Sequence, residues 1–216
     1  MKLKSLVSST ALVGLLATSS AFAAPIVFDF SPAAPEGAFG TSQDFTSGGY
    51  TITAYGFVAG TGAATALFHK YTVGQPAETG LGIAADGDHE IPPSYFVQLD
   101  VQSLIDAGFT SMGFTLGSLQ TGEQANISGD LTLGSYGDGT LLSTLTGGPV
   151  EQTVWLSLSS RYFNVTGGGT AGADPVFESV TVQTPSVPDG GSTALLLGTS
   201  LLAIGMALNR RNRKSV

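Results

Sequence analysis

The chain has 216 residues, 30 of them glycine and none cysteine, which excludes disulfides, thiol chemistry and cysteine-based metal sites. Between residues 24 and 189, 16 acidic residues stand against two basic ones, Lys70 and Arg161, for a formal charge of −14. We therefore expect no nucleic-acid partner, and the electrostatic partners that fit are divalent cations or neutral polymers.

The first 23 residues form a predicted secretory signal peptide. Lys2 and Lys4 precede an apolar stretch over residues 6–17, and Ala21-Phe22-Ala23 supplies an Ala-x-Ala cleavage site. A first transmembrane helix is the alternative, but the apolar stretch is short for one and small residues follow it. Residues 24–184 are then the exported domain, which is large enough for one stable core.

Short strands separated by turns fill residues 24–184. We predict them where β-branched and aromatic residues alternate with polar ones between Gly, Pro, Asn and Asp residues. The predicted strands are residues 26–30, 50–58, 66–73, 95–101, 111–119, 125–133, 141–145, 154–158, 162–165 and 176–182. Residues 31–45 are predicted to be a loop, and residues 103–108 one helical turn with Ser103 as its N-cap. The pattern predicts an all-β fold, an antiparallel two-sheet sandwich that is jelly-roll-like or Ig-like.

An acidic loop at residues 86–90 is the candidate metal site. Asp86, Asp88 and Glu90 place carboxylates at positions i, i+2 and i+4, and Gly87 allows a tight turn between two of them. Such a loop would present oxygen ligands to one Ca²⁺, although its spacing differs from that of an EF-hand. The other interpretation, which we favour, is a solvated hairpin tip, because acidic Gly-rich turns are common.

Trp155 is the candidate ligand-stacking residue. In the predicted strand 154–158, Val154, Leu156 and Leu158 share one face, which leaves Trp155 on the other. A tryptophan on the outer face of a sheet offers a flat apolar platform for a sugar ring. The alternative, which we favour, is that Trp155 anchors its strand against a loop or a second layer.

The C-terminal residues combine three features in a fixed order. Residues 185–191 are a linker that contains Val187-Pro188-Asp189-Gly190-Gly191, residues 192–208 carry no charge, and residues 209–216 contain Arg210, Arg211, Arg213 and Lys214. As a helix, the uncharged segment extends about 25 Å, enough for a thin hydrocarbon core. We expect a transmembrane helix at 192–208, with the basic residues stopping transfer and holding residues 209–216 in the cytoplasm. An ordinary single-pass anchor has these features too.

The tail resembles the sorting signals of the PEP-CTERM class, and most closely the variant with a Val-Pro-Asp-Ser-Gly signature. Val187, Pro188, Asp189 and Gly191 match that signature, whereas Gly190 stands where it has Ser. The resemblance implies that the partner is an exosortase, an integral-membrane, transpeptidase-like enzyme that cuts near the motif. It also implies a precursor anchored in the inner membrane and a mature protein in the cell envelope, at the surface or outside the cell. It implies nothing about the activity of the exported domain.

No motif in the sequence assigns a reaction to the exported domain. A Gly-x-Ser-x-Gly elbow, a Walker sequence and a His-Glu-x-x-His motif are all absent from the sequence. We therefore expect a non-enzymatic envelope or extracellular-matrix protein that associates with exopolysaccharide, with Ca²⁺ as its one candidate cofactor. A carbohydrate-binding module that uses Trp155 or exposed tyrosines is the second hypothesis. A glycan hydrolase is the third, because the separation of two carboxylates in space is not visible in a sequence.

Overall fold

The computed structural model describes residues 24–31, 36–75, 78–136, 139–148, 151–168, 174–183 and 197–204. The chain divides into two compact units, one comprising Ala23–Pro185 and the other the terminal segments Met1–Phe22 and Ser186–Val216. The predicted signal peptide (residues 1–23), sorting motif (187–191) and basic tail (209–216) lie outside the described residues.

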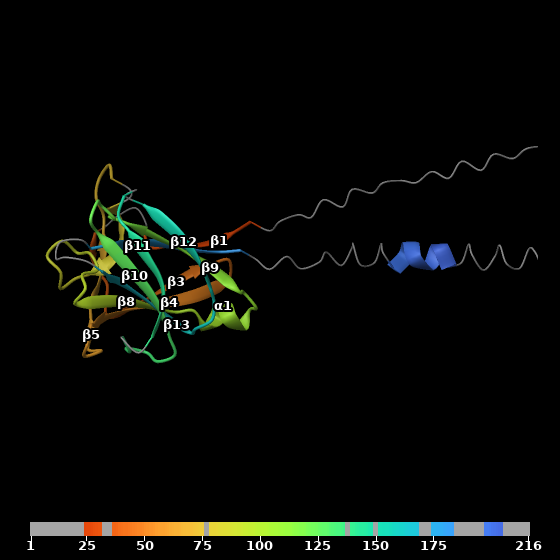
Figure 1. Cartoon of the computed structure of the whole chain (residues 1–216), viewed down its shortest axis with the longest axis horizontal. Coiled ribbons are helices and arrows are strands. Elements are labelled where there is room, and N and C mark those ends of the chain that lie inside the picture. The colour runs from red at the N-terminus through yellow and green to blue at the C-terminus, as the bar shows by residue number, and fades with distance from the viewer. Residues whose placement is uncertain are drawn as a thin grey trace, which may run out of the picture. The chain divides into compact units, whose positions relative to one another are not determined.

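Two antiparallel sheets make up the first unit (Figure 1). Sheet A runs in the order β12-β9-β14-β7-β6-β2, and β1 also pairs with β14. Its strands are β1 (Ile26–Asp29), β2 (Gly37–Ala38), β6 (Leu67–Lys70), β7 (Gly80–Ile83), β9 (Ser111–Gly117), β12 (Gln152–Ser157) and β14 (Val176–Val182). Sheet B runs in the order β11-β10-β13-β8-β4-β3, and β5 also pairs with β4. Its strands are β3 (Ser42–Ser47), β4 (Tyr50–Val58), β5 (Ala64–Thr65), β8 (Tyr95–Asp100), β10 (Gln124–Asp130), β11 (Thr140–Thr146) and β13 (Tyr162–Gly167). The predicted all-β, antiparallel two-sheet sandwich is confirmed.

The hydrophobic core lies between the two sheets. Alternate residues of the central strands point inward, as in β4, where Ile52 and Ala54 are fully buried and Thr53 between them is not. Aromatic rings join the layers: the ring centroids of Phe114 in β9 and Phe163 in β13 are 5.3 Å apart. Fully burying one such side chain contributes about 1.5–3 kcal/mol. Apolar burial therefore stabilises a domain that has no disulfide.

The strands differ from the prediction mainly where the chain is polar or rich in glycine. β4 and β14 occupy the predicted residues. The predicted loop at 31–45 is wrong in part, because β2 and the first residues of β3 lie there. β3 lies at the edge of sheet B, and its alternate residues are exposed. Phe45 is the one strongly apolar residue in β3, so the sequence there lacks the apolar alternation that predicts a strand. β7 was also not predicted, and its glycines pack on backbone: a Cβ on Gly80 would lie 2.7 Å from the carbonyl oxygen of Phe177.

The predicted helical turn is α1 (Gln102–Asp106), but its N-cap differs. Val101 occupies the N-cap position, and no side chain caps the helix, so the prediction for Ser103 is wrong. The Ser103 hydroxyl instead donates to the carbonyl oxygen of Thr51 in β4, which ties α1 to sheet B. Gly108, with φ of +83°, follows the helix in the left-handed conformation that glycine adopts at helix ends.

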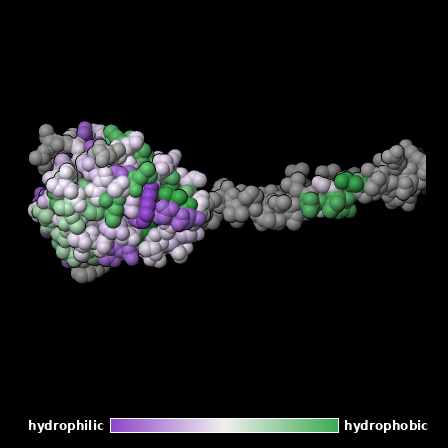
Figure 2. Space-filling model, turned by 90° about the horizontal axis from the view of Figure 1, so that it is seen from below, coloured by the Kyte–Doolittle hydropathy of each residue, from purple (hydrophilic) through white to green (hydrophobic). Residues whose placement is uncertain are grey.

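In the second unit the structure describes a helix over residues 197–204. Its large side chains are exposed, and Figure 2 shows it as an apolar segment. These side chains are Leu197, Leu201, Leu202 and Ile204. Within the described parts of the chain, none of the helices is both long and apolar enough to cross a membrane. The transmembrane helix predicted at 192–208 extends beyond the described residues at both ends.

Candidate functional site

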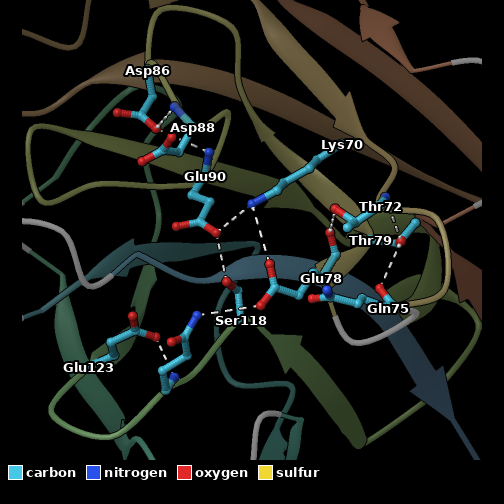
Figure 3. Close-up of polar contacts among 11 residues, drawn as sticks. Lys70, Thr72, Gln75, Glu78, Thr79, Asp86, Asp88, Glu90, Ser118 and Glu123 are labelled. Carbon is cyan, nitrogen blue, oxygen red and sulfur yellow. Dashed lines mark hydrogen bonds and ion pairs between the residues drawn. The ribbon is translucent and has the colours of Figure 1, made fainter.

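The acidic loop at residues 86–90 is a hydrogen-bonded turn that packs on sheet A (Figure 3). Oδ2 of Asp86 accepts the backbone N–H groups of Asp88 and Glu90, at 3.1 and 3.3 Å. His89 has a φ of +60°, and its ring stacks on Phe68 of β6 with centroids 3.6 Å apart. The Asp86 carboxylate therefore holds its own loop together, which is the local bonding expected of Asp in a turn.

The side chain of Glu90 points away from the other two acids and toward Lys70 (Figure 3). Its Oε1 accepts from Nζ of Lys70 and from the hydroxyl of Ser118, both at 2.6 Å. The two charged side chains are 14% and 12% exposed. Nζ of Lys70 also lies 3.9 Å from Oε2 of Glu78. Burial raises the pKa of Glu90, and the hydrogen bonds from Lys70 and Ser118 act in the opposite direction.

The structure does not bring the three predicted calcium ligands together at one point. Within the described ranges, no group of three or more His, Asp or Glu side chains is arranged to hold a metal ion. A further buried acid, Asp174, lies near this loop; burial, followed by the charges of Asp86 and Glu90, raises its pKa to about 6. The cluster around Lys70 is thus an internal ion-pair network that links β6, the acidic loop and Ser118 after β9.

Trp155 lies on the outer face of sheet A, as its position in the strand predicts. Val154 and Leu156 pack against the core, while Trp155 between them is 45% exposed. Its cross-strand partner is Gly113 of β9. A Cβ built on Gly113 would lie 3.0, 3.1 and 3.2 Å from three consecutive ring atoms of Trp155, namely Cε2, Cζ2 and Cδ2. A Cβ in the plane of the ring could not lie about 3 Å from all three of these bonded atoms, so the Cβ position must be above the ring plane. The indole therefore lies flat over Gly113.

Two rows of cross-strand partners run from β12 to β1 on this side of sheet A. The first row consists of Trp155 of β12, Gly113 of β9, Thr181 of β14 and Val27 of β1. The next row consists of Thr153, Thr115, Ser179 and Asp29. The hydroxyls of Thr115 and Thr153 are 2.9 Å apart and share a hydrogen bond. We call the outer side of sheet A formed by these two rows, together with Glu151 and Glu178, the Trp155 face.

Glu178 is a carboxyl on this face that the sequence does not single out. It lies where the pairing of β14 with β9 shifts register between Phe177 and Ser179, and it is only 9% exposed. Its Oε1 is buried with no hydrogen-bond partner among the described residues. Burial raises the pKa of Glu178 to about 7, and the charges of Glu151 and Asp29 add to the effect. A buried carboxyl without a hydrogen-bond partner lowers the stability of the fold. Glu178 occupies this position because of the β-bulge, which the alternation of residues in the sequence does not reveal.

A depression lies at the end of β10, where Asp130, Thr140 and Ser160 contribute to its lining. Oδ1 of Asp130 accepts the backbone N–H groups of Leu131 and Thr132, at 2.6 and 3.0 Å. Asp130 is the one carboxylate among the described residues that line it. A pair of carboxylates, which glycoside hydrolysis requires, is therefore not formed within that lining.

Comparisons with known proteins identify the tail and leave the domain open. Residues 186–211 match the model of the VPDSG-CTERM motif, which confirms that the tail carries a sorting signal of the PEP-CTERM class. No curated protein matches the chain. Similar solved structures include a mutant of CBM29-2, from work on ligand recognition by family 29 carbohydrate-binding modules, with a TM-score of 0.28 and 9% identity over 74% of this chain and 87% of that one. Another is the K1 cleaved adhesin domain of Lys-gingipain from Porphyromonas gingivalis, with a TM-score of 0.29 and 12% identity over 74% of this chain and 95% of that one. TM-scores this low carry no argument about function.

Proposed function

We propose that this chain is a non-enzymatic protein, exported and sorted to the cell surface, that binds exopolysaccharide through the Trp155 face. The single observation that supports binding is the indole of Trp155, which lies flat on Gly113 and leaves its other side to solvent. The sorting motif supports the destination.

Export and sorting proceed in this proposal through the two ends of the chain. Residues 1–23 direct secretion, and the helix at 192–208 anchors the precursor in the inner membrane with Arg210, Arg211, Arg213 and Lys214 inside. An exosortase then cuts near Val187–Gly191. The exposed leucines of the helix over residues 197–204 support the anchor, because apolar side chains are stable in lipid.

The test of sorting is the intact mass of the mature protein from host cells with and without the exosortase. We expect a C-terminus within residues 187–191 when the enzyme is present, and a mass that includes residues 210–216 when it is deleted. The same full-length mass in both strains would overturn the sorting proposal and leave a permanently anchored protein.

The connectivity supports a jelly-roll form of the sandwich. Most consecutive strands lie in opposite sheets, as with β7, β8, β9 and β10, which alternate between sheets A and B. β12, β9, β14 and β1 are neighbours in sheet A in that order, which supports binding on a sheet face rather than in a deep cleft.

A glycan fits the chemistry of the Trp155 face. One side of a sugar ring is apolar and stacks on an aromatic platform, while its hydroxyls need hydrogen-bond partners at the edge. The hydroxyls of Thr153 and Ser179 lie two residues along their strands from the row of the indole, about 7 Å away, and between them the buried Thr115 shares a hydrogen bond with Thr153. The strong negative charge of the domain disfavours acidic polysaccharides.

Glycan binding is tested by fluorescence, because Trp155 is the only tryptophan in the chain. We expect a non-acidic polysaccharide to change its emission, and retention of the full-length chain on the insoluble polymer to be lost in Trp155→Ala. Leu141→Ala is the matched control, since Leu141 is 60% exposed in β11 of the other sheet. Binding that survives in Trp155→Ala, or that is lost equally in both variants, would refute the proposal.

A hydrolase is the second candidate, and one observation favours it. Glu178, with a pKa that burial raises to about 7, lies in electrostatic range of Glu151, and a glycosidase uses a pair of carboxyls of which one is an acid with a raised pKa. Incubation of the chain with each polymer that it binds, followed by an assay of reducing ends, decides between a binding protein and a hydrolase. We expect no release; turnover that disappears in both Glu178→Gln and Glu151→Gln would show an enzyme instead.

A further inference from the structure

The Trp155 face is flanked by acids, and no cation balances them among the described residues. The domain has two cations, and each is engaged elsewhere: Lys70 pairs with Glu90 at 2.6 Å, and Arg161 pairs with Asp100 at 2.7 Å. The charged groups that act on Glu178 are Glu151 and Asp29, both negative. A ligand on this face therefore meets a concentrated negative potential.

The acids lie at a defined position relative to the indole. Residues 151, 153 and 155 are all exposed, so Glu151 and Trp155 lie on the same side of the chain. Four residues of extended chain separate them by about 13 Å. Asp29 ends the neighbouring row, opposite Ser179. Glu178 lies at the bulge in β14, next to Ser179. An extended ligand stacked on Trp155 that continues along β12 passes Thr153 and reaches Glu151, while Glu178 lies two strands across the sheet on β14.

Glu178 is the independent sign that this end of the face accepts a ligand. Its Oε1 is buried and has no hydrogen-bond donor among the described residues, yet part of the residue still reaches the surface. The donor that a buried carboxylate takes most readily is a cationic N–H group, because charge-assisted hydrogen bonds are the strong ones. The indole face adds to this preference, since tryptophan is the best aromatic partner for a cation.

We propose that the glycan bound by the Trp155 face carries free amino groups, as in a polymer of 2-amino-2-deoxy sugars. One ring stacks on Trp155, and the ammonium groups of the following rings pair with Glu178 and Glu151. This inference rests on the proposed glycan binding and specifies its ligand class. Acetylation of the amines removes their charge and so removes the selective interaction.

The test compares a β-linked glucosamine tetramer with its fully N-acetylated counterpart. Each is titrated into the full-length chain at neutral pH while Trp155 emission is followed. We expect the free amine form to bind at least about tenfold more tightly, and Glu178→Gln to weaken it about tenfold without changing affinity for the acetylated form. Circular dichroism of the variant checks that the fold is intact.

A control variant separates this site from the general negative charge of the domain. Asp44→Asn removes one charge from β3 on the exposed side of sheet B, where Asp44 accepts from the Thr53 hydroxyl at 2.7 Å. We expect no effect on either tetramer. Equal affinity for both tetramers, or equal weakening in Asp44→Asn and Glu178→Gln, would overturn the amino-sugar inference. The proposed function fails separately, when Trp155 emission responds to no polysaccharide at all.

Discussion

Replacing Lys70 by methionine tests the reasoning about the internal ion-pair network. The substitution keeps the alkyl chain and removes the charge that faces Glu90 at 2.6 Å. Both side chains are mostly buried, at 14% and 12% exposure, and Ser118 remains as the one other hydrogen-bond donor to Oε1. Leaving a buried charge without its partner costs about 3–5 kcal/mol, so we expect a loss of this size in the free energy of unfolding at about pH 8.

The pH dependence of that loss follows from the pKa of Glu90. Burial holds this pKa above its ordinary value in the folded protein, so protonation of Glu90 stabilises the fold at low pH, and the stabilisation disappears as the pH rises through the folded-state pKa. Removing Lys70 raises that pKa further. The cost of Lys70→Met is therefore largest at about pH 8 and smaller at about pH 5.

The assay is urea unfolding of the chain at both pH values, followed by far-UV circular dichroism. The double variant Lys70→Met/Glu90→Gln removes the uncompensated charge and should recover more than half of the loss. A cost below about 1 kcal/mol at about pH 8, or the same cost at both pH values, would refute the assignment of Lys70 and Glu90 as a buried pair.

Further predictions concern close contacts, buried acids and the predicted metal site. Gly82→Ala places a Cβ against the carbonyl oxygen of His89 and should cost about 3 kcal/mol in thermal unfolding, whereas Gly87→Ala, with open space around it, should be neutral. Because the folded-state pKa of Glu178 is raised to about 7, its stabilising protonation is lost as the pH rises, so the melting temperature should fall from about pH 5 to about pH 8 and Glu178→Gln should flatten that slope. Gly113→Ala should push the indole off the sheet and shift tryptophan emission, with weaker glycan retention. Since the three acids of the loop do not converge on one point, neither Ca²⁺ nor a chelator should change the melting temperature, and a rise with Ca²⁺ would restore the metal-site prediction.

The sequence by itself determined those features that depend on local order along the chain. Alternation of apolar and polar residues placed β4 and β14 at their observed ends, because the side-chain period of a strand is fixed at two residues. The same alternation put Trp155 on the outer side of its strand. The sorting signal was also visible, since it is read as a contiguous motif whatever the domain before it folds into.

Only the tertiary structure decided which residues meet. The sequence did not predict β3 because an edge strand needs few apolar residues. It did not predict β7 because Gly80 is required by the close approach of the Phe177 backbone, not by the strand propensity of the residue. Asp86 and Glu90 are four residues apart, yet they face different partners, since the fold brings Lys70 and Ser118 within hydrogen-bond distance of Glu90. The platform under Trp155 depends on the register that sets it opposite Gly113, 42 residues earlier in the chain, and a register between distant strands is fixed by packing of the whole sheet.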